Sequence, residues 1–154
     1  MTADTTDLVK TALIEALEKL RDEVRTMAEP LSEAKFWSKP LDPGNSFGHL
    51  VLHLTGNLNH FVGGQIGGSG YVRDREREFT ETRLPSKAEA MKQLDEAVAT
   101  FRRIVSGLSA EQLAAPHPEA RFGIAMNALM QLLAHFALHR GQMSYIVRLP
   151  CTGA

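Results

Sequence analysis

Apolar residues recur at three- and four-residue steps in four stretches of the chain, with polar and charged residues between them. Such spacing is typical of amphipathic α-helices that bury one face. No stretch alternates with the two-residue period of a strand. The pattern predicts an all-α four-helix bundle. Its helices are expected at residues 7–27, from Ser46 to about 62, from Ser86 to about 108, and from between 123 and 127 to Leu149.

Residues that break or cap helices lie at the ends of these stretches. Pro30 prevents continuation of the first helix, because proline has no amide hydrogen and clashes with the preceding turn. Ser86 and Glu89 have the spacing of a capping box at the start of the third helix. Ser109 and Gln112 have the same spacing and predict a second capping box on one short helical turn.

Two connections, residues 28–45 and 63–85, are too long to be simple bundle turns. Each allows either a crossover or a loop that covers a site. In the first connection, Phe36 and Trp37 are expected to pack onto the core. The second opens with five glycines within residues 63–70, which are expected to end the second helix and open a mobile loop.

Composition limits the classes of function. With 154 residues and 44% hydrophobic content, the chain is expected to form a single domain, residues 1–154. Lys and Arg total 17 against 18 for Asp and Glu, which argues against nucleic acid or a membrane surface as partner. The N-terminus lacks a basic, apolar leader, no apolar run approaches roughly 18 residues, and the single Cys151 allows no internal disulfide. We therefore expect a soluble, cytoplasmic protein.

Three histidines form the candidate functional site. His135 and His139 lie four residues apart in the last predicted helix and point from one face on successive turns. Of the histidines in the second helix, His53 lies closest to the apolar stripe and is the best placed to face inward. Three imidazoles from two helices predict one metal site with at least one open position. Zn, Ni, Co and Fe(II) all accept such ligands.

The same residues also allow simpler interpretations. An i, i+4 histidine pair can be an ordinary hydrogen-bonded pair. The third histidine, and the absence of a Glu-x-x-His motif of di-iron bundles, favour a mononuclear metal site. Gly141 weakens the helix by about 1 kcal/mol relative to alanine, which predicts close approach by another helix or a bound group. Solvated or capping roles are expected for the remaining histidines, His49, His60 and His117.

Two phrases carry a resemblance to a known family. SFGHLVLHLTGN in the second helix and AHFALHRGQMSYIV in the last resemble the signatures of the DinB/YfiT-like metalloenzyme superfamily. They are most similar to a branch of unknown function with HLTGN-like and HxxxHxGQ patterns. The resemblance spans nearly the whole chain. It implies a four-helix bundle in which His53, His135 and His139 bind a divalent metal. Characterised relatives include S-transferases and isomerases that use a low-molecular-weight thiol, such as bacillithiol or mycothiol, and many form homodimers.

Three functional hypotheses follow. The first is a metal-dependent S-transferase, in which the metal holds a small thiol as thiolate for attack on a small electrophile. The second is a non-catalytic stress-related or interaction module, in which a structural metal joins the second helix to the last. A metal-dependent hydrolase ranks lower, because the core faces of these two helices carry no carboxylate to act as general base.

Other polar residues are candidates for orienting the metal ligands or facing a substrate, although each could equally be an ordinary packing or surface residue. They are Asn57, Gln142 and Tyr145. Alternating charges in the phrase YVRDREREF bring three arginines into the second connection. These arginines could recognise the carboxylates of a thiol cofactor, or form a solvated ion-pair strip or a dimer contact. They are Arg73, Arg75 and Arg77.

Overall fold

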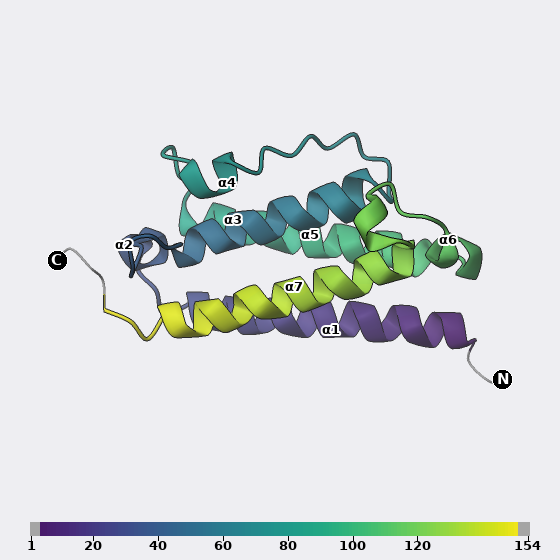
Figure 1. Cartoon of the computed structure of the whole chain (residues 1–154). Helices are drawn as coiled ribbons and strands as arrows, with labels where there is room; N and C mark the ends of the chain where they lie inside the picture. The colour runs from purple at the N-terminus through teal and green to yellow at the C-terminus, as the bar shows by residue number, and fades with distance from the viewer. Residues whose placement is uncertain (1–3, 151–154) are drawn as a thin grey trace.

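The computed structural model describes residues 4–150, and Cys151 lies outside this range. Four long helices form a bundle (Figure 1), and they are α1 (Thr5–Ala28), α3 (Phe47–Leu58), α5 (Lys87–Gly107) and α7 (Ala125–Ile146). The shorter segments are α2 (Glu33–Trp37), the π-helical turn η1 (Asn59–Gly64), α4 (Arg77–Thr80), α6 (Ala110–Ala114) and the 3₁₀ turn η2 (Ala120–Phe122). The described residues contain no β-strand, and none of their helices is long and apolar enough to cross a membrane. The predicted all-α four-helix bundle is confirmed.

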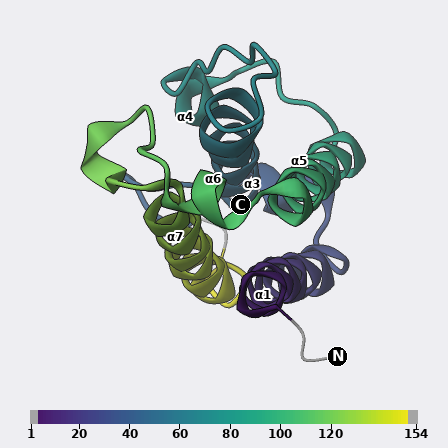
Figure 2. The ribbon, with the colours of Figure 1, turned by 90° about the vertical axis from the view of Figure 1, so that its right-hand side faces the viewer.

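Two long helices that follow one another in the sequence, α3 and α5, run parallel. Helices α1 and α7 run in one direction along the bundle, and α3 and α5 run in the other (Figure 1). Seen end-on, α5 and α7 each lie between α1 and α3 (Figure 2). Because α3 and α5 are parallel neighbours, the connection between them, residues 65–86, must return along the length of the bundle. This crossover carries α4 over the outer side of α3.

Helix α3 is the most deeply buried element. The apolar stripe predicted for it lies in the core, and its members are Phe47, Leu50, Val51, Leu54, Leu58 and Phe61. The opposite side of α3 is also covered, because α2 and α4 pack against it. A Cβ atom on Gly48 would come within 2.4 Å of the Trp37 ring, so α2 can approach only a glycine at this point. The predicted packing of Phe36 and Trp37 onto the core is confirmed, since Phe36 is fully buried and Trp37 packs against the core.

Burial of the outer side changes the expected position of His49. Its angle from the apolar stripe predicted a solvated or capping residue, but the ring is only 6% exposed because Trp37 covers it. The Nδ1 atom of His49 lies 2.6 Å from the hydroxyl of Ser46, whose Oγ also accepts a hydrogen bond from the His49 backbone N–H. His49 therefore supports the N-terminal cap of α3 from a buried position, and the expectation of solvation was wrong.

The glycine-rich stretch differs from the expected helix end and loop. The helix does not end at residue 62 but continues as the π-helical turn η1 to Gly64. Gly67 then packs closely, because a Cβ atom there would lie 2.4 Å from the Ile104 side chain of α5 and 2.8 Å from a backbone carbonyl. These glycines allow the chain to turn tightly against α5 before the crossover begins.

Capping follows the sequence signals in part. Ser109 and Gln112 form the predicted capping box at the start of α6. At α5, Ser86 accepts a hydrogen bond from the Glu89 backbone N–H, but the Glu89 carboxylate accepts one from Gln93 instead of the reciprocal bond. Only half of that predicted box therefore forms. Helix α7 ends at Ile146 and not at Leu149, because the chain turns there.

Lysines from neighbouring elements donate hydrogen bonds to carbonyls at or just beyond the carboxyl ends of three helices. Lys87 at the start of α5 donates hydrogen bonds to the carbonyls of residues 28, 29 and 31 at the end of α1. Lys10 of α1 donates to the carbonyls of residues 106 and 108 at the end of α5. Lys35 of α2 donates to the carbonyl of Leu149. Because α1 and α5 are antiparallel, the start of each lies beside the end of the other, where cations are favoured.

Lys87→Met tests this arrangement. The substitution keeps the length of the side chain but leaves three carbonyls, two of them half-buried, without their charged donor. We expect the free energy of unfolding to fall by about 1–2 kcal/mol. Urea denaturation measures the change, with Lys92→Met as the control, since the Lys92 ion pair with Glu96 is exposed. An equal effect of the two substitutions would contradict the capping role.

Candidate metal centre

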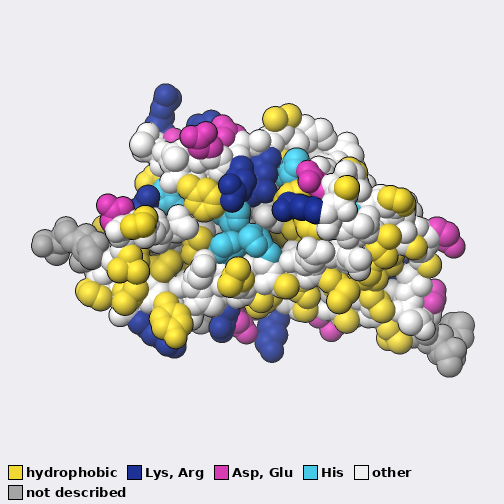
Figure 3. All heavy atoms as spheres, viewed as in Figure 1, with side chains coloured by type: hydrophobic (Ala, Val, Ile, Leu, Met, Phe, Trp, Pro, Cys, Tyr) yellow, Lys and Arg dark blue, Asp and Glu magenta, His cyan; other side chains and the backbone are white. Residues whose placement is uncertain are grey.

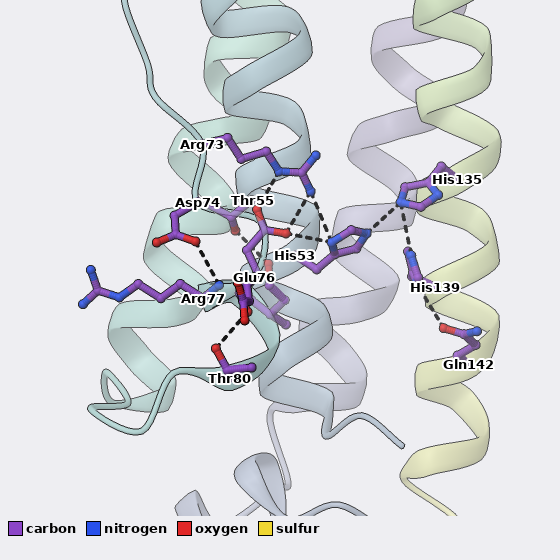
Figure 4. A network of polar contacts seen from close by, with 12 residues as sticks. His53, Thr55, Arg73, Asp74, Glu76, Arg77, Thr80, His135, His139 and Gln142 are labelled. Carbon is purple, nitrogen blue, oxygen red and sulfur yellow. Dashed lines mark hydrogen bonds and ion pairs between the residues drawn. The ribbon is translucent and has the colours of Figure 1, made fainter. Parts of the chain in front are cut away.

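Three histidine side chains meet between α3 and α7. The Nε2 atom of His135 lies 2.9 Å from Nε2 of His53 and 3.1 Å from Nε2 of His139. One nitrogen from each ring lies within 4.8 Å of the other two. Figure 4 shows His53 reaching from α3 toward His135 and His139, which project from successive turns of α7. The structure thus brings together the three histidines selected from the sequence, on antiparallel helices that pack side by side.

The hydrogen bonds on the far sides of two rings fix which nitrogens carry protons. Nδ1 of His53 lies 2.8 Å from Oε2 of Glu78 and 3.2 Å from Nη2 of Arg73. Because Nη2 already donates to Oε2 at 2.8 Å and an ionised carboxylate only accepts hydrogen bonds, we assign the proton to Nδ1 of His53. Nδ1 of His139 likewise donates to the amide oxygen of Gln142 at 2.7 Å. In a neutral imidazole the other nitrogen then has a lone pair. Both Nε2 atoms therefore direct lone pairs toward Nε2 of His135.

This arrangement fits a cation better than it fits hydrogen bonding alone. A neutral His135 can place at most one proton on Nε2, which leaves one of the two facing lone pairs without a donor. Histidine nitrogens bind Zn²⁺ at about 2.0–2.1 Å, so tetrahedral ligands lie roughly 3.3 Å apart. Two of the three observed separations, 2.9 and 3.1 Å, are close to that spacing, and all three nitrogens lie within 4.8 Å of one another. The chemistry of the donor set therefore fits one divalent transition-metal ion.

Glu78 comes to the site from the crossover and was not selected from the sequence. Its Oε1 accepts a hydrogen bond from Nε of Arg73 at 2.6 Å, and its Oε2 accepts from Nη2 of Arg73 at 2.8 Å as well as from His53. Both side chains are only 8% exposed. A carboxylate on the outer nitrogen of a metal-binding histidine fixes the orientation of the ring and raises its basicity.

Gly56 explains how a carboxylate reaches the middle of α3. A Cβ atom at this position would lie 2.0 Å from Oε1 of Glu78, well inside contact distance. Gly56 follows His53 by three residues, so the two share one face of the helix. The glycine of the HLTGN phrase therefore makes room for the side chain that orients the histidine. A glycine in mid-helix, one turn after a candidate ligand, was the available sequence signal.

Burial and neighbouring charges favour the neutral form of His135 and His139. The pKa of His135 falls to about 4, because burial disfavours its charged form and the nearby His139, His53, Arg73 and Arg121 add positive repulsion. Burial also lowers the pKa of His139, although its hydrogen bond to Gln142 opposes this. Neutral imidazole is the form that binds metal, so the fold prepares the ligands.

The Glu78 carboxyl is held in its charged form, whereas His135 and His139 are held neutral. Burial by itself would raise its pKa, but the hydrogen bonds from His53 and Arg73 outweigh burial and hold the pKa below its usual value. The sequence argument against a hydrolase found no buried carboxylate on the core faces of the two histidine-bearing helices. That statement holds for α3 and α7, but the crossover supplies one. The alternating charges around Glu78 are typical of a solvated strip, so nothing in the sequence indicated that this one carboxylate is buried.

A hollow of about 540 Å³ adjoins two of the histidines. Its lining includes His53 and His135, and the other residues are Asn57, His60, Phe61, Arg73, Arg75, Arg121, Phe122, Gln131 and Leu132. In Figure 3 histidine side chains come to the surface near the centre of this face, with basic side chains directly beside them. The volume lies in the range of small-molecule sites, roughly 300–1,000 Å³.

The remaining candidates divide between the site and the surface. Asn57 is buried and lines the hollow, and Gln142 holds His139. Tyr145 is 69% exposed and is not part of the lining. Of the arginines, Arg75 lines the hollow, whereas Arg77 pairs with Glu81 at the surface. Arg75 therefore lies where it could meet a ligand, whereas Arg77 belongs to a solvated ion pair.

For Gly141, the predicted approach of another helix is wrong within residues 4–150. A Cβ atom added there would meet nothing within 4 Å, so neither another helix nor a side chain of the site approaches it. The side chain of His117 is buried and not solvated. Its Nδ1 accepts a hydrogen bond from the backbone N–H of Glu119, the residue before η2, and η2 itself has no side-chain cap.

Comparisons with known proteins agree with this architecture. A family model described as mycothiol-S-transferase matches residues 12–149. YfiT from Bacillus subtilis, described as a probable metal-dependent hydrolase with an unusual four-helix bundle topology, superposes with a TM-score of 0.72. The identity is 17%, over 90% of this chain and 86% of YfiT. A DinB-like protein from Bacillus cereus gives a TM-score of 0.67 and 15% identity over 92% of this chain and 95% of its own. These structures share the fold. No curated protein matches the sequence.

Gly56→Ala is expected to destabilise the protein, although alanine is the better helix former. The new methyl group would displace the Glu78 carboxylate and break its buried pair with Arg73, and such losses cost several kcal/mol. Gly141→Ala is the matched control. It lies in mid-helix with open space around it, and we expect a gain of about 1 kcal/mol. Thermal or urea unfolding of the metal-free proteins compares the two, and a stabilised Gly56→Ala variant would contradict the role given to this glycine.

The lowered histidine pKa values predict acid sensitivity of the metal-free protein. The unfolded state takes up a proton at His135 near pH 6.5, whereas the folded state does so only near pH 4. This contribution to stability is fully present above pH 6.5 and is lost as the pH falls from 6.5 toward 4. Urea unfolding at pH 7 and pH 5 measures the loss. His135→Gln should show a smaller loss over the same interval, and an unchanged loss would contradict the assignment.

Proposed function

The chain belongs to the mycothiol-S-transferase family, and from this membership we propose that it is a metal-dependent enzyme that transfers a low-molecular-weight thiol to a small electrophile. The observation that carries the proposal is the convergence of three histidine Nε2 atoms at the edge of a hollow large enough for a small molecule. A structural metal site that only joins two helices would need no such hollow.

His53, His135 and His139 are the residues that would hold the metal. A divalent ion bound there would act as a Lewis acid that favours the thiolate form of the second reactant over the thiol. Because all three ligands are neutral, they leave the full charge of the ion to attract an anion. Three protein ligands with one open position are typical of catalytic sites, whereas structural zinc sites have four.

The chain itself supplies orientation. Glu78 and Gln142 hold the rings of His53 and His139 from their outer nitrogens, so neither ring can turn its lone pair away. The buried amide of Asn57 and the rings of Phe61 and Phe122 line the space where an electrophile would lie. In the reaction, the thiol releases its proton to solvent, its sulfur forms a bond to a carbon of the electrophile, and the leaving group on that carbon departs with the electron pair of its bond.

A metal-dependent hydrolase is the second candidate, because the structurally similar YfiT carries that description and Glu78 is a buried carboxylate. A general base, however, needs a free oxygen directed at the attacking water. Both oxygens of Glu78 accept hydrogen bonds from Arg73 or His53, on the side of His53 away from the other histidines. Glu78 is therefore better placed to orient His53 than to accept a proton from water.

Metal analysis is the first test. The protein is purified without a chelator or a histidine tag, and its transition-metal content is measured. We expect about one equivalent in the native protein and a large loss in His53→Ala and His139→Ala. His60→Ala is the control, because His60 lines the hollow but is not one of the three converging rings. Absence of metal in the native protein, with no uptake of Zn, Ni or Fe(II), would overturn the proposal.

Activity then separates the enzyme from the interaction module. Metal-loaded protein is incubated with mycothiol and a neutral alkylating agent, and the thioether product is measured. A folded His139→Ala variant without activity supports the transferase. If the native protein forms no thioether above the uncatalysed rate with any alkylating agent screened, and His139→Ala only lowers stability, the module becomes the better explanation.

A further inference from the structure

The hollow beside the histidines carries an unbalanced positive charge. Three arginines are among its lining residues, and no aspartate or glutamate is among them. The chain as a whole has a net charge of −1, so this concentration is local and not part of a generally basic surface. In Figure 3 basic side chains border the exposed histidines. We propose that Arg75 and Arg121 bind a carboxylate of one of the two reactants, an inference that takes its reaction from the proposed function.

The three arginines differ in the partners that their guanidinium groups already have within the protein. Arg73 is buried and committed to Glu78 through two of its nitrogens. Arg75 has no carboxylate partner in residues 4–150, and its guanidinium lies 5.7 Å from the centre of the Phe79 ring. Arg121 has one distant acidic neighbour, with its Nε 3.8 Å from Oε2 of Glu119. Arg75 and Arg121 are therefore the cations available to a ligand.

Aromatic rings hold the guanidinium of Arg121 in place. It lies 4.6 Å from the centre of the Phe122 ring and 5.2 Å from that of Phe61. A guanidinium packed against rings keeps its N–H edge free, and that edge matches a carboxylate through two parallel hydrogen bonds. The side chain remains 64% exposed, so its position reflects these ring contacts and not burial.

The rest of the lining suits an organic acid better than an inorganic anion. Phe61, Phe122 and Leu132 provide apolar surface for a carbon skeleton, and the amides of Asn57 and Gln131 provide neutral hydrogen-bonding groups. The histidines lie in the same lining as the arginines. A reactant held by its carboxylate at the arginines could thus place its reacting atom toward the histidines. Charge recognition would select the substrate while the neutral histidines remain free for the metal.

Binding to the metal-free protein tests the arginines independently of any reaction. Succinate is titrated against the protein by calorimetry, with its uncharged diamide as the ligand control. We expect saturable binding of succinate alone, weakened about tenfold or more in Arg75→Gln and in Arg121→Gln. Arg77→Gln should bind as the native protein does, because Arg77 pairs with Glu81 outside the hollow. Thermal unfolding verifies that each variant is folded. No succinate binding, or equal binding by all variants, would overturn the proposal.

Kinetics on the metal-loaded protein show which reactant carries the carboxylate. One arm compares 4-(chloromethyl)benzoate with its amide as electrophile, using mycothiol. The other compares N-acetylcysteine with its amide as thiol, using a neutral electrophile. Arg121→Gln should raise KM about tenfold or more for the acid in one arm and leave the matching amide unchanged. A variant that affects acid and amide equally in both arms would overturn the recognition of a reactant. If the native metal-loaded protein shows no transfer activity but the metal-free protein still binds succinate through the arginines, the result counts against the proposed function alone.

Discussion

The buried pair between Glu78 and Arg73 is the interaction on which the site depends. A carboxylate in the interior is costly unless it is fully hydrogen-bonded, and here Arg73 and His53 occupy both of its oxygens. Both residues of the pair belong to the crossover, and the hydrogen bond between His53 and Glu78 joins the crossover to α3, which fixes the segment that brings Arg75 to the hollow. The same carboxylate sets the tautomer of His53, so that its lone pair faces His135. The Glu78 carboxylate therefore connects the return of the chain along the bundle to the preparation of the metal ligands.

The topology of the bundle explains why such a contact can form. Parallel packing of α3 and α5 requires a long return segment, and this segment covers a face of α3 that would otherwise meet solvent. Helix α3 consequently combines an apolar stripe with buried polar residues on its other side, among them His49, His53 and Asn57. Glycines at positions 48 and 56 allow α2 and Glu78 to approach closely. The price in helix propensity of these glycines is offset by the packing they permit.

Around the histidines, neutral and charged side chains have different roles. Burial lowers the pKa of His135 and His139, and Arg73 and Arg121 lower that of His135 further, which suits metal ligation by neutral imidazole. The arginines lie in the same hollow but differ in role, because Arg73 is paired within the protein while Arg75 and Arg121 are open to a ligand. The proposed transferase would use the histidines for the sulfur and the open arginines for a carboxylate. This division follows from which cations already have partners.

Local patterns determined much of this protein. The 3.6-residue periodicity gave the four long helices, and the i, i+4 spacing of His135 and His139 gave two of the three converging rings, because both depend on residues close in sequence. His53 could be ranked above His49 and His60 by its angle from the stripe. Only the tertiary structure decided that Glu78 is buried, that Gly56 makes room for it, that Arg121 joins the hollow, and that Gly141 has open space around it. Each of these depends on which distant segment lies against a helix or stays away from it, and for Glu78 and Gly56 that segment is the crossover.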